Sequence, residues 1–391
     1  MSEVDTKEVV AVKQHIDYCS SCYICSTLCP YEALKKNPET GKVSLEIEKC
    51  QVCGLCYSNC PAKAIDTIYY DVASLNRYLE RAKQEYESDT LVIMCKGSAP
   101  DFAWVERLLG VKKFIPLSVP CVGRVPAEIY LRALLMGIKN INVLACDDDY
   151  CRFKRGSSVA TNVILGLNPL LEQLGYGRDV ITLVRHSLKV KVDTNLCISC
   201  GNCVFYCPYN AAKLESPGVV SFDLSLCRGC GLCVAMCPAL ALELENWERE
   251  HISTLIARLS SEMKPPKILV FRCQWAVFPA LNGDGEPASN IRAIDLPCAS
   301  RVDTFHILEA LQQGVDGVLI AACSEEDCKQ QKASGKAQHS VAKLGERLNQ
   351  IGLQGRLHFC TVTPRYPERF ERELEEFRKR IEAIYSKEGK K

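Results

Sequence analysis

The sequence lacks the features that would place the protein in a membrane or on a nucleic acid. No run of about eighteen or more apolar residues occurs, so we expect no segment that spans a bilayer. The formal net charge is only +1, which argues against nucleic-acid binding and against a polybasic membrane anchor. Residues 1–10 carry acidic side chains and no apolar signal core, so we expect no export and a cytoplasmic protein.

The motifs of most catalytic cofactors are also missing. There is no glycine-rich nucleotide fingerprint after a strand, no Walker loop, no H-E-x-x-H motif and no haem attachment motif. The six histidines show no spacing typical of metal ligands. Without a flavin or nucleotide site, two-electron chemistry such as hydride transfer is expected to occur on another protein.

Cysteine, in contrast, is abundant, with 25 copies that mostly fall in tight groups. In a long chain without an export signal, clustered thiols indicate metal ligands rather than disulfides. Matching cysteines also recur at a nearly constant offset: Cys19 and Cys197 are 178 positions apart, and Cys121 and Cys298 are 177 positions apart. We therefore expect an internal duplication whose first copy ends near Ser187.

The run C-x-x-C-x-x-C-x-x-x-C-P occurs four times, beginning at Cys19, Cys50, Cys197 and Cys227. Three thiolates on one tight loop can reach three irons of a single cube, whereas the fourth cysteine turns away and ligates the neighbouring cluster. Zinc is not favoured, because zinc knuckles use isolated C-x-x-C pairs separated by a longer gap. The rule predicts four [4Fe-4S] clusters with these ligand sets: Cys19, Cys22, Cys25 and Cys60; Cys29, Cys50, Cys53 and Cys56; Cys197, Cys200, Cys203 and Cys237; Cys207, Cys227, Cys230 and Cys233.

These segments resemble bacterial-type double-cluster ferredoxins over Val12–Ile68 and Val190–Leu244. In three of the four loops, glycine follows the second cysteine and lets backbone amides approach the cluster sulfides. The first loop has Tyr23 at this position, so we expect it to be slightly more crowded without losing a ligand.

After each ferredoxin-like segment, short apolar runs alternate with amphipathic stretches. This order predicts α/β domains of flavodoxin-like type, with a parallel sheet covered on both faces. The expected strands are Leu91–Met94, Phe114–Val119, Ile141–Ala145, Val180–Val184, Ile268–Phe271, Ala293–Leu296, Gly317–Ala321 and Leu357–Val362. The expected helices include Ala73–Tyr86, Ala127–Met136, Val159–Leu174, His251–Met263 and a charged surface helix, Glu368–Tyr385.

Each predicted α/β domain contains four further cysteines, most of them at or just after the end of an expected strand. Because the carboxyl ends of parallel strands meet at one edge of a sheet, these thiols could converge there. Buried cysteines can also be plain packing residues, but recurrence in both copies favours a site. Cys360 matches Leu183 in the other copy, so we interpret it as core packing. The candidate sets are Cys95, Cys121, Cys146 and Cys151, and Cys273, Cys298, Cys323 and Cys328.

The segments Phe271-Arg-Cys-Gln-Trp, Cys298-Ala-Ser-Arg-Val-Asp and Gly314–Cys323 resemble the delta subunit of methyl-viologen-reducing hydrogenase. That iron–sulfur protein links hydrogenase to heterodisulfide reductase in methanogens. The resemblance covers Lys267–Arg378 and, more weakly, Thr90–His186. It implies a [2Fe-2S] cluster at each four-cysteine site. The family commonly has one more cysteine where this chain has Ser98 and Ala276, which leaves the ligand set open.

Charged residues near the α/β cysteines have two interpretations each. Arg124 and Arg301 could donate hydrogen bonds to cluster sulfur or to a thiolate and raise the reduction potential, or they could form surface salt bridges. The acidic runs Asp147–Asp149 and Glu325–Asp327 are interpreted as solvated loops. A docking face or an effect that lowers the potential is the alternative.

Together these features predict α+β ferredoxin modules (residues 10–70 and 189–247) that alternate with α/β domains (residues 71–188 and 248–391). We expect a non-catalytic subunit that relays single electrons between a flavoprotein resembling heterodisulfide reductase and a hydrogenase, formate dehydrogenase or related oxidoreductase. Two alternatives stay open: electron delivery for the activation of another metalloenzyme, and thiol or disulfide reduction at one α/β cluster site.

Overall fold

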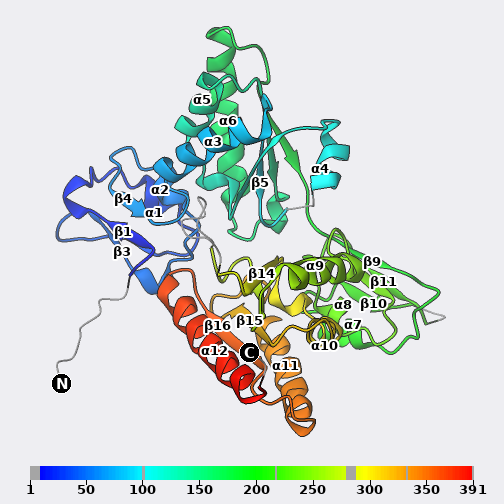
Figure 1. The fold of residues 1–391 in the computed structure, drawn as a ribbon. Helices are drawn as coiled ribbons and strands as arrows, with labels where there is room; N and C mark the ends of the chain where they lie inside the picture. Colours follow the sequence, from blue (N-terminus) through cyan, green and yellow to red (C-terminus); the bar gives the residue numbers. More distant parts are fainter. Residues whose placement is uncertain (1–8, 99–101, 216–217, 279–287, 332, 390–391) are drawn as a thin grey trace, which may run out of the picture. The chain divides into compact units, whose positions relative to one another are not determined.

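The computed structural model describes residues 9–98, 102–215, 218–278, 288–331 and 333–389 (Figure 1). These residues form two compact units. The first unit comprises Val9–Ser187 and Phe278, and the second comprises Leu188–Val277 together with the described residues of 288–389. Each unit contains a small cysteine-rich region followed by an α/β region. Among the helices of the described residues, none combines the length and the apolar character that crossing a bilayer requires.

The cysteine-rich region of the first unit is built from very short elements. Its strands form two antiparallel pairs, β1 with β4 and β2 with β3. No strand exceeds three residues, because the cysteine loops interrupt the chain at short intervals. The elements are β1 (Val12–Gln14), α1 (Ile24–Leu28), β2 (Leu34–Lys36), β3 (Val43–Leu45), α2 (Leu55–Ser58) and β4 (Ile65–Thr67).

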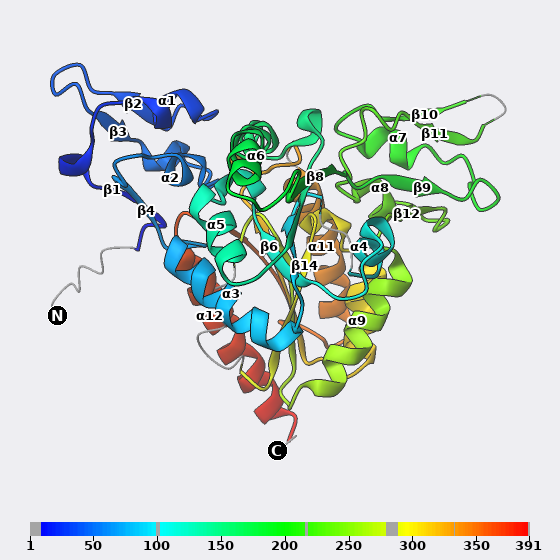
Figure 2. The same ribbon diagram turned by 90° about the horizontal axis from the view of Figure 1, so that it is seen from above.

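The corresponding region of the second unit has the same pairing, β9 with β12 and β10 with β11 (Figure 2). Its core includes the side chains of Cys203, Cys227 and Cys233 among aliphatic residues. Thiols therefore occupy positions that an ordinary domain of this size would fill with larger apolar groups. The elements are β9 (Val190–Val192), α7 (Asn202–Tyr206), β10 (Ala212–Leu214), β11 (Val220–Phe222), α8 (Leu232–Ala235) and β12 (Leu242–Leu244).

The α/β region of the first unit contains a four-stranded parallel sheet of order β6-β5-β7-β8. All six residues of β5 are buried, as expected for a strand that is covered on both faces. The elements are α3 (Val72–Tyr86), β5 (Thr90–Cys95), α4 (Phe102–Leu109), β6 (Ile115–Val119), α5 (Ala127–Leu135), β7 (Asn140–Ala145), α6 (Gly156–Gln173) and β8 (Ile181–Arg185).

The second unit has a parallel sheet of the equivalent order, β14-β13-β15-β16. Helix α12 packs on β15 and β16 through the buried Phe377 and Ile381, so this charged helix also has an apolar face. The elements are α9 (Arg249–Glu262), β13 (Ile268–Cys273), β14 (Ile291–Leu296), α10 (Thr304–Gln312), β15 (Gly317–Cys323), α11 (Ala333–Gln350), β16 (Leu357–Val362) and α12 (Pro367–Lys387).

All eight strands expected in the α/β regions are present, each within two residues of its expected ends. The carboxyl ends of these strands carry the cysteines that the sequence predicts there. Cys95, Cys273 and Cys323 are the last residues of β5, β13 and β15, and Cys146 directly follows β7. The carboxyl edge of each sheet therefore collects the candidate thiols.

Candidate functional site

The four cysteine loops share one backbone conformation. The residue after the second cysteine has a left-handed φ in each of them: +80° at Gly54, +75° at Gly201, +76° at Gly231 and +60° at Tyr23. Tyr23 adopts this conformation although its Cβ makes it unfavourable. The Tyr23 hydroxyl donates a hydrogen bond to the carbonyl oxygen of Gly41 (2.7 Å), which fixes the orientation of the side chain.

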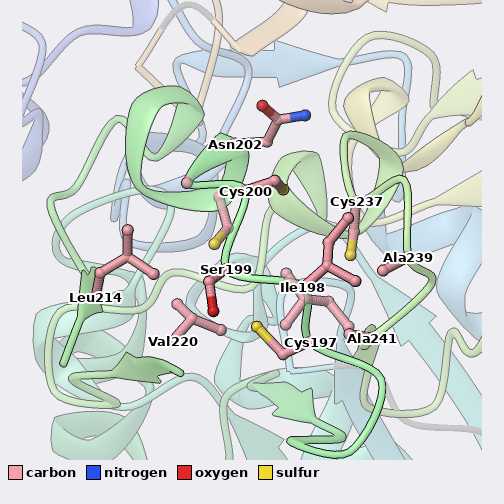
Figure 3. Close-up of a pocket in the computed structure, with 13 residues that line it drawn as sticks. Cys197, Ile198, Ser199, Cys200, Asn202, Leu214, Val220, Cys237, Ala239 and Ala241 are labelled. Atoms are coloured by element: carbon pink, nitrogen blue, oxygen red, sulfur yellow. The ribbon is translucent and has the colours of Figure 1, made fainter. Parts of the chain in front are cut away.

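A cavity in the second unit is lined by the complete predicted set of Cys197, Cys200, Cys203 and Cys237. Figure 3 shows three of these residues around the cavity, with Cys237 reaching it from the loop after α8. The other lining residues are mostly apolar, among them Ile198, Leu214, Val220 and Leu242. Cys237, which belongs to the next cysteine run, thus lines the same cavity as the other three cysteines of its predicted set.

A second cavity, in the first unit, is lined by another complete set: Cys29, Cys50, Cys53 and Cys56. Burial raises the pKa of Cys53 to about 12, and the nearby thiols of Cys50 and Cys29 add to this effect. Such thiols remain protonated at neutral pH unless a metal cation stabilises the thiolate. An apolar cavity lined by four thiols fits an iron–sulfur cluster, which takes thiolate ligands.

In the two remaining sets, the thiols lie close enough to affect one another's pKa. Burial raises the pKa of Cys25 to about 11, and the thiols of its own set contribute: Cys60, Cys19 and Cys22. Burial likewise raises the pKa of Cys233, with contributions from Cys230, Cys227 and Cys207. Within the described residues, no three His, Cys, Asp or Glu side chains are arranged to hold a single metal ion.

The four α/β cysteines of the first unit converge at the carboxyl edge of its sheet. The sulfur atoms of Cys95 and Cys146 lie 3.5 Å apart. Hydrogen bonding to Cys121 lowers the pKa of Cys151 to about 6. Gly156, at the start of α6, lies beneath this second pair, because a Cβ placed there would be 2.0 Å from the Cys121 sulfur and 3.4 Å from the Cys151 sulfur.

The second unit assembles its α/β cysteines in the same place. The sulfur atoms of Cys273 and Cys323 lie 3.5 Å apart. Hydrogen bonds from Cys298 and Cys323 lower the pKa of Cys273 well below its usual value. The hydrogen bond to Cys273 and burial raise the pKa of Cys298, and the nearby thiol of Cys328 adds to this effect.

Ser98 and Ala276 occupy the positions where the family commonly has one more cysteine, and neither replaces it as a ligand. The Ser98 hydroxyl is buried and lies within hydrogen-bond distance of the carbonyl oxygens of Cys95 (3.0 Å) and Leu144 (3.1 Å). Ala276 is buried and offers no donor or ligand atom. Each α/β site therefore offers four cysteines. Cys360 lies in β16, buried and paired with Ala321, as expected for a packing residue.

In the second unit, one ferredoxin-like cysteine set adjoins the α/β site directly. Cys230 and Cys298 belong to the same buried cluster, together with Leu232 and Ala333. The Ser300 hydroxyl lies 3.2 Å from the Cys230 carbonyl oxygen and 3.1 Å from the Cys298 sulfur. We call the sets of Cys29 and Cys207 the inner sets, and the sets of Cys19 and Cys197 the outer sets.

In each unit, a tyrosine that was not predicted from the sequence joins the cysteine-rich region to the α/β region. The Tyr31 hydroxyl donates to the Arg152 carbonyl oxygen (3.3 Å), and the Tyr209 hydroxyl to Gln330 Oε1 (2.7 Å). Burial raises the pKa of Tyr31, and so do nearby thiols of both the inner set and the α/β site, Cys53, Cys151 and Cys121. The repeated C-P-Y sequence was the available signal.

The arginines after the second α/β cysteine are not on the surface. Arg124 and Arg301 are both 0% exposed, which rules out the surface salt bridge for either. Each packs on the loop glycine of the inner set: a Cβ at Gly54 would meet the Arg124 side chain at 2.8 Å, and one at Gly231 would meet Arg301 at 2.7 Å. The arginines thus lie where the two regions of each unit join.

The interpretation of the acidic runs as solvated loops is correct for Asp148 but wrong for Asp327. Asp148 is exposed and pairs with Arg185. Asp327 is only 5% exposed and accepts two hydrogen bonds from Arg365, at 2.7 and 2.9 Å. The partner lies 38 positions away in the sequence, so the local acidic pattern could not reveal it.

Gly231→Ala is expected to destabilise the second unit more than Gly201→Ala. Both glycines have a left-handed φ, so each alanine costs roughly 1–2 kcal/mol of backbone strain. Only at Gly231 would the new methyl group also collide with Arg301, since a Cβ at Gly201 would lie 3.7 Å from its nearest neighbour, the Leu214 side chain. Thermal unfolding of the iron-loaded variants measures the difference, and equal losses of stability would contradict the packing of Arg301 on this loop.

The sequence profile of the family described as "Methyl-viologen-reducing hydrogenase, delta subunit" matches residues 91–194 and 268–384 of this chain. Two profiles described as "4Fe-4S dicluster domain" match residues 11–61 and 190–244. These four regions cover both cysteine-rich regions and both α/β sheets, so the two resemblances stated from the sequence are confirmed.

Similar proteins are components of heterodisulfide reductases and hydrogenases. A component of the ferredoxin:CoB-CoM heterodisulfide reductase of Methanosarcina mazei is 30% identical over 78% of this chain and 38% of its own length. The ferredoxin/F(420)H(2)-dependent counterpart in Methanosarcina acetivorans is 31% identical over 80% of this chain and 39% of its own length. The chain thus spans less than two fifths of these relatives. An iron–sulfur component of the F420-non-reducing hydrogenase of Methanococcus voltae is 31% identical over 23% of this chain and 65% of its own length.

Proposed function

Since the chain belongs to the family of the methyl-viologen-reducing hydrogenase delta subunit, we propose that it is an electron-transfer subunit of an oxidoreductase complex. Its two dicluster domains bind [4Fe-4S] clusters. Bound clusters of this type supply one-electron redox chemistry. The protein holds the clusters in a fixed spatial order, and its side chains determine the charge and polarity around each cluster.

The observation that carries this proposal is the contact between the inner set and the α/β site of the second unit. Cys230 and Cys298 share one buried cluster, and Ser300 bridges their backbone and sulfur atoms. Ligands that adjoin in this way bring two redox centres close together, which is what a relay requires. A pair of unrelated structural sites would not need the contact.

The outer sets supply the other end of each relay. Cys22 and Cys200 are exposed, whereas Cys53 and Cys230 of the inner sets are buried. We therefore assign the outer sets to electron exchange with partner proteins. Within each unit the order is outer set, inner set and α/β site.

The proposal includes the ligands and partners in detail. All sixteen cysteines of the four ferredoxin-like sets ligate four [4Fe-4S] clusters, and each α/β site holds a [2Fe-2S] cluster. The partners are a flavoprotein resembling heterodisulfide reductase and a hydrogenase, formate dehydrogenase or related oxidoreductase, in the cytoplasm. The relatives from Methanosarcina and Methanococcus support this pairing by the complexes in their names.

Iron and acid-labile sulfide analysis with Mössbauer spectroscopy tests the proposal on protein purified without oxygen. We expect roughly 20 irons per chain, with a two-iron component beside the four-iron component. Cys298→Ser should remove about two irons and reduce the two-iron signal by half. Cys360→Ser is the matched control, because this buried cysteine lies in the same sheet but outside the site, and it should leave the iron content unchanged.

A content of about 16 irons with only four-iron signals would refute the two-iron sites. An iron content well below 16 would refute the relay itself.

A further inference from the structure

The buried arginine of the first unit has no acidic partner. Arg124 donates hydrogen bonds to the carbonyl oxygens of Tyr69 and Val52, and its guanidinium lies 5.1 Å from the centre of the Tyr70 ring. In the described part of the chain, no carboxylate forms an ion pair with it. The titratable groups that act on its guanidinium include the hydroxyl groups of Tyr70 and Tyr57 and the thiols of Cys53, from the inner set, and Cys121, from the α/β site.

The equivalent arginine of the second unit is surrounded by carboxylates. Arg301 Nη2 lies 3.6 Å from Glu243 Oε2, and Arg301 Nη1 lies 3.7 Å from Asp303 Oδ2. Arg249 binds the same two carboxylates at 2.9 and 3.1 Å. His306 Nδ1 lies 3.1 Å from Asp303 Oδ1. Two arginines and two carboxylates therefore give this junction a formal charge of zero, apart from any proton on the histidine.

The sequence explains why the first unit lacks this compensation. The position of Asp303 is occupied there by Pro126, and that of Arg249 by Val72. The position of Glu243 is occupied by Asp66, which is exposed and paired with His15 at 2.6 Å. Both units thus have a buried arginine at this position, but the charged residues around it differ between them.

A second position near the α/β thiols also carries a positive charge in the first unit and none in the second. Lys96 directly follows Cys95 and is only 7% exposed, whereas the second unit has the neutral Gln274 at this position. The acidic runs do not offset the difference, because each unit has three carboxylates between its third and fourth α/β cysteines. At this position the first unit therefore carries a lysine where the second unit carries a neutral side chain.

We infer that the two units differ in reduction potential, and that Arg124 makes the centres of the first unit easier to reduce. This inference rests on the electron-transfer role proposed above. A reduced cluster carries one more negative charge than an oxidised one, and an unshielded cation in a buried site stabilises that charge. Around Arg301, the carboxylates of Glu243 and Asp303 cancel most of the same effect.

The difference in potential matches the two units to different redox partners. Centres of the second unit are expected to exchange electrons with partners of lower potential, and centres of the first unit with partners of higher potential.

Anaerobic redox titration followed by electron paramagnetic resonance tests the inference on the iron-loaded full chain. The wild type should show a high-potential and a low-potential group of clusters. Arg124→Met should make part of the high-potential group about tenfold harder to reduce, a shift of about 59 mV for a one-electron couple. Arg124→Lys keeps the charge and should keep most of the potential, which a purely structural role of the arginine would not predict.

Asp303→Asn is the complementary variant, because asparagine can still accept the hydrogen bond from the His306 backbone that begins α10. It removes a negative charge beside Arg301 and should raise the potential of part of the low-potential group by a similar factor. This result is expected even if Arg124→Met fails to load its clusters.

The inference is overturned if Arg124→Met shifts the low-potential group, or if neither variant moves any potential at full iron content. Missing iron in the wild type would instead refute the electron-transfer role, and it would be seen before any titration.

Discussion

Removal of iron is expected to unfold both cysteine-rich regions and to leave both parallel sheets folded. Where the structure describes them, the cysteine-rich regions contain three-residue strands and helices of three to five residues. Regions of this size bury too little apolar surface to be stable alone, so the free energy of metal binding is largely their folding free energy. Thiols of the predicted ligands occupy the core of the second such region.

The parallel sheets do not depend on metal in this way. Their strands are five to seven residues long, and β5 and β15 are buried throughout. The α/β cysteines lie at one edge of each sheet, so loss of a cluster there affects the edge loops more than the central strands. Unfolding should therefore stop at the boundary between the two kinds of region.

Hydrogen exchange with mass spectrometry, with and without an iron chelator under nitrogen, measures this result. Peptides from residues 9–68 and 190–245 should lose nearly all protection, while peptides from β5, β7, β13 and β15 should keep it. Incubation without chelator for the same time is the control. Retained protection in the cysteine-rich regions would show that their fold does not need the clusters.

Periodic patterns made most of the architecture predictable. Leu91–Met94 and Gly317–Ala321 contain no polar side chain and lie in strands that are buried throughout, so the position and type of these strands follow from local sequence. The convergence of the α/β cysteines followed from one topological rule, because each of them lies at or near a strand end. The crossed ligand sets remain a prediction from the spacing of the cysteines in each C-x-x-C-x-x-C-x-x-x-C-P run.

Contacts between segments far apart in the sequence were not predictable. The burial of Arg124 depends on Tyr69 and Val52, which lie in another region of the unit. The packing of Arg124 on Gly54 leaves no local pattern, and the repeated C-P-Y sequence marks Tyr31 and Tyr209 without revealing their distant partners. The same limit explains the wrong interpretation of Asp327, whose charge is compensated by the distant Arg365.

Asp327→Asn is expected to destabilise the α/β region of the second unit by about 3–5 kcal/mol. Asp327 and Arg365 form a bidentate pair with both side chains less than a tenth exposed. Removing one partner leaves a buried charge without compensation, which costs far more than the pair contributes. The pair also ties the loop before Cys328 to the segment between β16 and α12, so the α/β site should bind iron less tightly.

Exchange of the β15 and β16 amides measures the free energy of opening. Glu375→Gln is the matched control, since its pair with Arg378 has similar geometry, with two bonds of 2.7 Å, on the exposed face of α12. Solvent screens that pair, so its loss should change the exchange little. The double variant Asp327→Asn/Arg365→Met removes both charges and should regain much of the lost stability. If the double variant is as unstable as Asp327→Asn alone, the lost stability comes from the shape of the loop, and the uncompensated charge of Arg365 is not its cause.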